Sequence, residues 1–120
     1  MSAEPTLSIA SSAEWGALSC KIVPERAVVR VVPMGTLDMA TAEVLEEQLR
    51  EAVGAGFHDV ILDLSELDFM DSTGLRLVLR WDAAARSDGI NFAVAPGSPK
   101  IQRVFELTGT AGHVPFVKPG

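Results

Sequence analysis

A carboxylate and two hydroxyls stand side by side in the middle of the chain, at Asp71, Ser72 and Thr73, directly before Gly74. They follow the apolar run at residues 60–62, which is typical of a central strand covered on both faces, and they precede a segment with helical periodicity. Such a strand-to-helix junction lies at the carboxyl end of a sheet, where open α/β sheets place their functional loops. Asp71 or Ser72 can cap the helix, which puts the Ser72 hydroxyl beside free backbone N–H groups, and Gly74 leaves the backbone open to another molecule.

Two interpretations of this turn stay open on its residues. It can simply cap a helix, and local chemistry alone favours that interpretation. It can also carry a phosphate on Ser72, because a helix N-terminus accommodates phosphate without unfolding. The phosphate would add about −1.5 to −2 charges and three acceptor oxygens, beside the carboxylate of Asp71 and near that of Asp38. A protein packed over the turn would be expelled by sterics, desolvation and repulsion, so the turn has the chemistry of a phosphorylation switch on binding.

The sequence offers little support for catalysis. It contains no Gly-rich phosphate loop, no dinucleotide-binding fingerprint and no Gly-x-Ser-x-Gly elbow. Ser72 acting as a nucleophile would need an adjacent base, normally histidine, and neither His58 nor His113 is near it in sequence. The single cysteine, Cys20, forms no internal disulfide and cannot hold zinc alone. We therefore expect a protein that is not an enzyme.

Composition points to one globular domain. The chain has 120 residues, of which 48% are hydrophobic and 22% are charged, with a net charge of −6. That negative charge disfavours direct binding to nucleic acid or to an anionic membrane, where affinity comes largely from Lys and Arg. No apolar run approaches the roughly 18 residues of a membrane span, and the first residues lack the basic start of a secretory signal. The sequence predicts a cytoplasmic location.

The elements that must position the turn alternate along the chain. Strands are expected at residues 18–22, 27–32, 58–64, 90–95 and, at a sheet edge, 114–117, and helices at 42–53, 72–86 and 98–109, with Thr41 capping the first and Ser98 the third. This order predicts an α/β fold with a mixed, mainly parallel β-sheet that begins with an N-terminal hairpin. We expect residues 1–16 to form a flexible N-terminal arm and residues 17–118 to form the domain.

The helix after Ser72 is apolar over a wider arc than one packing face needs. The core stripe consists of Leu75, Val78 and Leu79. Leu77, Trp81 and Ala85 extend the arc beyond it. Either the helix is wedged between neighbours, which is the more common situation, or part of the arc is a docking surface.

Several stretches together resemble a known family. They are Gly35-Thr36-Leu37-Asp38 with Thr41-Ala42-Glu43, Val60-Ile61-Leu62-Asp63-Leu64, Phe69-Met70-Asp71-Ser72-Thr73-Gly74-Leu75, and Ser98-Pro99 with Arg103-Val104-Phe105-Glu106-Leu107-Thr108-Gly109. The pattern resembles the bacterial anti-sigma factor antagonists of the STAS domain class, over about residues 18–117. The resemblance implies a single STAS-like domain with three or four helices packed mainly on one face of the sheet.

The resemblance also implies partner switching. In that family the unphosphorylated antagonist binds an anti-sigma factor that is also a serine kinase, and so releases the sigma factor. The kinase phosphorylates the serine that corresponds to Ser72, binding is lost, and a metal-dependent serine phosphatase restores the free form. The nucleotide and metals belong to the partners, so no cofactor is expected here. The residues expected to bind the partner are Asp38, Met70, Asp71, Thr73, Gly74, Arg76 and Leu77.

Two features depart from the family pattern. Arg76 stands where many members have a small residue, often glycine, and its guanidinium is placed to pair with a phosphate or to select a kinase through an acidic patch. The leader of about 16 residues before Leu18 is longer than the minimal module requires.

A second hypothesis keeps the fold without the switch. In it the chain is a constitutive STAS adaptor subunit in a sensory or lipid-transport complex.

Overall fold

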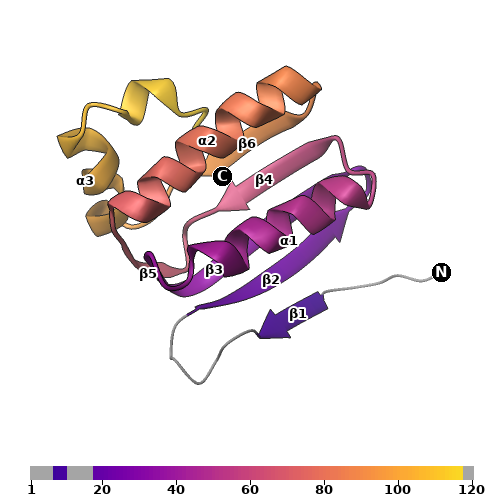
Figure 1. Ribbon diagram of the computed structural model, residues 1–120, viewed down its shortest axis with the longest axis horizontal. Helices are drawn as coiled ribbons and strands as arrows, with labels where there is room; N and C mark the ends of the chain where they lie inside the picture. The colour runs from indigo at the N-terminus through magenta and orange to yellow at the C-terminus, as the bar shows by residue number, and fades with distance from the viewer. Residues whose placement is uncertain (1–6, 11–17, 118–120) are drawn as a thin grey trace.

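The computed structural model describes residues 7–10 and 18–117, and its helices and strands alternate as the sequence predicts (Figure 1). The strands are β1 (Leu7–Ala10), β2 (Leu18–Glu25), β3 (Val28–Leu37), β4 (Asp59–Asp63), β5 (Leu67–Met70) and β6 (Asn91–Ala95). The helices are α1 (Ala42–Gly54), α2 (Ser72–Asp88), α3 (Pro99–Leu107) and the short 3₁₀ helix η2 (Ala111–His113). The expected α/β fold is confirmed.

The strands form one mixed sheet in the order β1-β2-β3-β4-β6, with β5 paired to the far end of β3. The pairs β1–β2 and β2–β3 are antiparallel, whereas β3–β4 and β4–β6 are parallel. The predicted hairpin is β2–β3, whose turn contains Arg26 in a left-handed conformation with φ 61°. The sheet is therefore the mixed sheet with an N-terminal hairpin that the sequence predicts.

β2 and β3 extend beyond their predicted ends, and three further strands differ from the prediction. β1 lies inside the expected arm 1–16, so that interpretation missed a strand, while the other residues of the arm lie outside the described part of the chain. β5 lies between the expected strand 58–64 and the expected helix 72–86, where no strand was predicted. At the C-terminus, the predicted strand 114–117 is reduced to one parallel bridge between Phe116 and Val94, next to Pro115, which has no N–H to donate.

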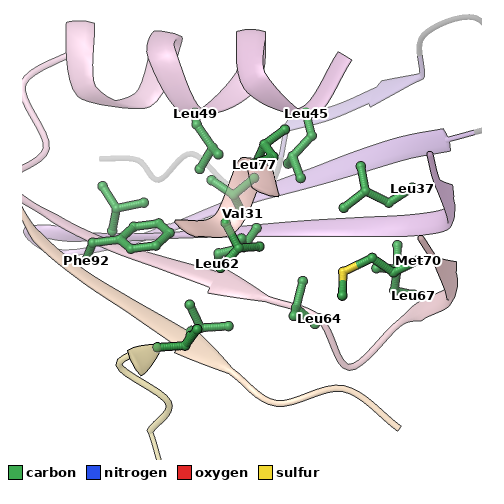
Figure 2. Packing of buried hydrophobic residues seen from close by; sticks show 14 of the residues in the cluster. Val31, Leu37, Leu45, Leu49, Leu62, Leu64, Leu67, Met70, Leu77 and Phe92 are labelled. Carbon is green, nitrogen blue, oxygen red and sulfur yellow. The ribbon is translucent and has the colours of Figure 1, made fainter. Parts of the chain in front are cut away.

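The helices α1 and α2 cover the same face of the sheet (Figure 1). This follows from topology, because the crossovers β3–α1–β4 and β4–α2–β6 step in the same direction and each is expected to be right-handed. Figure 2 shows Leu45 and Leu49 pointing from α1 toward Val31 and Leu62 of the sheet. These four side chains are completely buried and form the middle of the core.

Cys20 belongs to the same core. Its side chain is 1% exposed, and burial raises the pKa of its thiol to about 11. At neutral pH the thiol is therefore protonated and packs as a small apolar group.

The wide apolar arc of α2 is explained by wedging. Leu77 and Ala85 are buried and Trp81 packs, partly buried, against the core. The helix contacts α1 on one side and α3 on the other, and lies over β6. The core therefore covers Leu77 and Ala85 fully and Trp81 in part.

An ion pair joins β3 and β4 on the face of the sheet that points away from α1 and α2. Arg30 Nη1 lies 3.0 Å from Asp63 Oδ2. Burial alone would raise the pKa of Asp63, but hydrogen bonds from Ser65 and Arg30, together with the Arg30 charge, hold it below its ordinary value.

Within residues 7–10 and 18–117, no helix has the length and apolar character needed to cross a bilayer.

Candidate functional site

The turn that carries Ser72 lies where β3 and β5 end side by side. Leu37, the last residue of β3, is opposite Met70, the last residue of β5. The backbone N–H of Asp71 donates to the Leu37 carbonyl oxygen at 3.2 Å. Asp38 and Asp71, the next residues of the two strands, are therefore held close together, as the sequence predicts. We call this region the switch corner: residues 38–41 and 69–76.

Asp71 caps α2 with its side chain. Its Oδ1 atom accepts hydrogen bonds from the N–H groups of Thr73 at 2.8 Å and Gly74 at 3.3 Å. The expectation that the Ser72 hydroxyl lies beside free N–H groups is corrected here, because these two donors already have a carboxylate partner. Ser72 is instead the first residue of the helix and is exposed.

Asp38 organises the other half of the corner. Its Oδ1 atom accepts from the backbone N–H groups of Ala40 at 3.0 Å and Thr41 at 3.2 Å. Thr41 occupies the N-cap position of α1 but makes no side-chain cap, so that prediction is wrong in its chemistry. Its hydroxyl donates to the Thr36 carbonyl oxygen at 2.7 Å and fastens the loop to β3.

Gly74 faces inward. A Cβ atom added there would lie 2.6 Å from Met70 Cγ and 2.9 Å from Leu37 Cγ and Cδ2. Gly74 therefore lets α2 approach the ends of β3 and β5, and it does not open the backbone to an incoming molecule as expected. Figure 2 shows Leu37 and Met70 grouped with Leu67 at this end of the core.

Three expected partner contacts are buried. Met70 is 2% exposed, Leu77 is 0% exposed, and Gly74 is buried. These residues shape the corner from inside and have no surface for a partner, which corrects their expected role. Asp38, Asp71 and Thr73 are partly exposed and Arg76 is exposed, so each has some accessible surface.

Two exposed apolar side chains belong to the switch corner and were not predicted as partner contacts. Met39, in the loop after Asp38, is 81% exposed, and Phe69, near the end of β5, is 46% exposed. The exposure of Phe69 was not predicted, because no strand was expected at residues 67–70. Within β5 the burial pattern leaves Phe69 facing outward between two positions that face the core. Large exposed apolar side chains beside a polar turn are typical of protein interfaces.

Within the described residues, neither histidine makes a hydrogen bond to Ser72. His113 lines a surface depression of about 420 Å³ together with Asp82 and Arg86. Asp82 is ten residues further along α2, about 15 Å along its axis at 1.5 Å per residue. No hydrogen bond links Ser72 to a histidine in the described part of the chain, and no three His, Cys, Asp or Glu residues gather there as a metal site would need.

Comparison with protein families gives a match over nearly the whole domain. Residues 20–118 match the family model described as "Mlab, STAS domain". The matched segment contains every element from β3 to η2 and both halves of the switch corner.

Named relatives and a solved structure are similar to this chain. The chain is 36% identical over 75 residues to BtrV of Bordetella bronchiseptica, named as an anti-sigma factor antagonist, covering 62% of this chain and 65% of that one, just under two thirds. It is 37% identical over 75 residues to the anti-sigma-B factor antagonist of Staphylococcus epidermidis, covering 62% and 69%. The crystal structure of an anti-sigma factor antagonist from Mycobacterium paratuberculosis superposes with a TM-score of 0.72 at 25% identity, over 86% of this chain and 87% of that one.

Proposed function

The chain belongs to the anti-sigma factor antagonist family of STAS domain proteins, and we propose that Ser72 is its switch. In this proposal the unphosphorylated protein binds and sequesters an anti-sigma factor that is also a serine kinase, and phosphorylation of Ser72 releases that kinase. The named relatives support the antagonist role, and the geometry of the switch corner supports the choice of residue.

The observation that carries the proposal is the exposure of Ser72 in the same corner as two exposed apolar side chains. A kinase must reach the hydroxyl, and Ser72 is exposed at the first position of α2. A partner that covers the corner also needs apolar surface to bury, which Met39 and Phe69 supply. One corner therefore offers both the site of modification and the contact that the modification would break.

Phosphate at this position would act on binding and leave the fold intact. Ser72 makes no hydrogen bond that the fold depends on among those of the described residues, since Asp71 already caps the helix. A phosphate would place about two negative charges next to the carboxylates of Asp71 and Asp38. A partner closing over this cluster would have to desolvate it, and burying unpaired charge is strongly unfavourable.

The catalytic groups belong to the partners in this proposal. The anti-sigma factor serine kinase supplies ATP and metal, and a metal-dependent serine phosphatase removes the phosphate. This chain supplies a substrate hydroxyl and a binding surface, so we propose that it is not an enzyme and needs no cofactor. The partners act on transcription, which places the interaction in the cytoplasm, without direct binding of this chain to nucleic acid or membrane.

A pulldown from the native organism with Ser72→Ala and Ser72→Asp forms tests the proposal. The alanine form should retain an ATP-binding protein and take up no phosphate, whereas the aspartate form should fold normally and retain little of it. Ser87→Ala, which removes an exposed hydroxyl near the other end of α2, should behave as the parent protein. If the aspartate form retains the same ATPase as well as the parent does, the switch is wrong.

The second candidate is the constitutive STAS adaptor, and one measurement separates it from the switch. The same exposed corner would serve as a permanent contact in a sensory or lipid-transport complex. Intact-mass analysis of the protein isolated from its own cells should show a species heavier by one phosphate if Ser72 switches, and that species should be absent from Ser72→Ala cells. A single unmodified mass under all growth conditions supports the adaptor.

A further inference from the structure

We propose that Arg76 is the built-in counter-ion of phosphorylated Ser72, closing an ion pair within α2 when the phosphate is added. The inference rests on the proposed function, because it assumes that Ser72 carries phosphate. In this proposal the exposed Arg76 side chain stabilises the phosphorylated form of the protein.

The helix places the two side chains on one face. Ser72 and Arg76 are four residues apart in α2 and both are exposed. Side chains at positions i and i+4 are neighbours on a helix, and each leans toward the N-terminus of its helix. The Arg76 guanidinium therefore reaches back toward the Ser72 oxygen, and its planar donors match phosphate oxygens.

Arg76 differs from the other two arginines of α2 in having no acidic partner. Arg80 pairs with Glu46 of α1 at 3.0 Å, and Arg86 pairs with Asp82 at 2.5 Å. No ion pair of Arg76 is present within residues 7–10 and 18–117. Its neighbours three and four positions away are Ser72, Thr73, Leu79 and Arg80. The only charge among them is positive, and like charges at this spacing are destabilising. A phosphate on Ser72 would supply the missing anion.

The rest of the corner offers a phosphate little else. The N–H groups of Thr73 and Gly74 are occupied by Asp71 Oδ1, so they do not bind a second anion. The acidic side chains around the corner are those of Asp71, Asp38 and Asp68, and each repels a phosphate. Other cations also lie on the elements that contact α2 in the described part of the chain. They include Arg50 of α1 and Lys100 and Arg103 of α3. Arg76 is the cation that shares a helix face with Ser72 at one turn.

Phosphoserine placed at position 72 during translation tests the ion pair without any kinase. Titration of the phosphorus NMR signal gives the second pKa of the phosphate, which is near 6 when unperturbed. Arg76 should lower this pKa, so Arg76→Gln should raise it by about half a unit. Arg76→Lys should retain part of the effect. The shift should shrink in 1 M salt, where the Debye length is about 3 Å.

Arg80→Gln is the matched control, because it removes the same charge from the same helix two turns from Ser72. It should change the phosphate pKa far less than Arg76→Gln. Equal shifts from both variants, or none from either, would overturn the proposal. An unchanged pKa with weaker kinase binding by the unphosphorylated Arg76→Gln form would also overturn it, since Arg76 would then contact the partner.

The outcome is independent of the switch itself. If intact-mass analysis finds no phosphate in cells, the proposed function fails even where Arg76 lowers the phosphate pKa. If the phosphate forms in cells and its pKa ignores Arg76, the switch stands and the ion pair fails.

Discussion

The Asp71 N–H donates to the Leu37 carbonyl oxygen across 3.2 Å, and this bond joins the start of α2 to the end of β3. On one side of it, Asp38 ties down the loop before α1, and on the other Asp71 caps α2. The two halves of the switch corner are therefore one hydrogen-bonded unit. Ser72 is presented by a rigid support, which suits a surface that a partner must recognise and a kinase must reach.

Replacement of Asp71 separates its cap from its charge. Asp71→Ala removes the acceptor for Thr73 and Gly74 and should lower the free energy of unfolding by about 1 kcal/mol. Asp71→Asn keeps an oxygen acceptor and should lose well under half of that. Chemical denaturation of the three proteins measures both values. Equal losses would show that the negative charge, and not the cap, stabilises the turn.

Gly74→Ala tests the close approach of α2 to the sheet. The added methyl would lie within 3.0 Å of Met70 and Leu37, both in the core, so the cost should be about 1–3 kcal/mol. Gly112→Ala is the control, because a Cβ atom there meets nothing within 4 Å. Urea unfolding should distinguish the two variants clearly. A Gly74→Ala protein as stable as its control would contradict the packing described here.

Phe69 should be an anchor of the partner interface. Because its side chain is only about half buried, Phe69→Ala should lower the free energy of unfolding by about 1 kcal/mol. It should weaken kinase binding at least tenfold, a loss of about 1.4 kcal/mol or more. Leu107, on α3 and 77% exposed, provides a matched apolar control. Calorimetric titration of both variants with the purified kinase gives the comparison. Equal weakening by Leu107→Ala would mean that the apolar contact is not specific to the corner.

The Arg30–Asp63 ion pair should make stability depend on pH. The folded pKa of Asp63 is held below its unfolded value of about 3.9, so its contribution is present above that pH and is lost as pH falls through the folded pKa. Asp63→Asn should cost about 0.5–1 kcal/mol at pH 7, since the pair is only partly buried, and this cost should fall as the pH drops through the folded pKa of Asp63. Asp88→Asn, at an exposed carboxylate, should show no such pH-dependent loss in the same thermal melts.

Sequence periodicity predicted the helices better than the ends of the strands. The stop signals at Gly54 and Gly89 and the Ser98-Pro99 start lie where α1, α2 and α3 end or begin. β5 was missed because its four residues become a strand only by pairing with the extended end of β3, a tertiary contact that no local pattern encodes.

The buried members of the candidate site were missed for a related reason. Leu77 looked like surplus apolar surface, because the sequence does not say that α1 and α3 enclose α2. Gly74 looked open to an incoming molecule for the same reason. The sequence does not show that Leu37 of β3 and Met70 of β5 pack against it. Asp38 lies close to Asp71 because β3 and β5 pair up to Leu37 and Met70, whereas the sequence linked Asp38 to this turn only through the family resemblance.

The affinity of one purified anti-sigma factor kinase for this protein, measured before and after stoichiometric phosphorylation of Ser72, tests the central claim most directly. We expect the dissociation constant to rise at least 100-fold, about 2.7 kcal/mol, while the circular dichroism spectrum stays unchanged. An unaltered dissociation constant with complete phosphorylation would contradict the account.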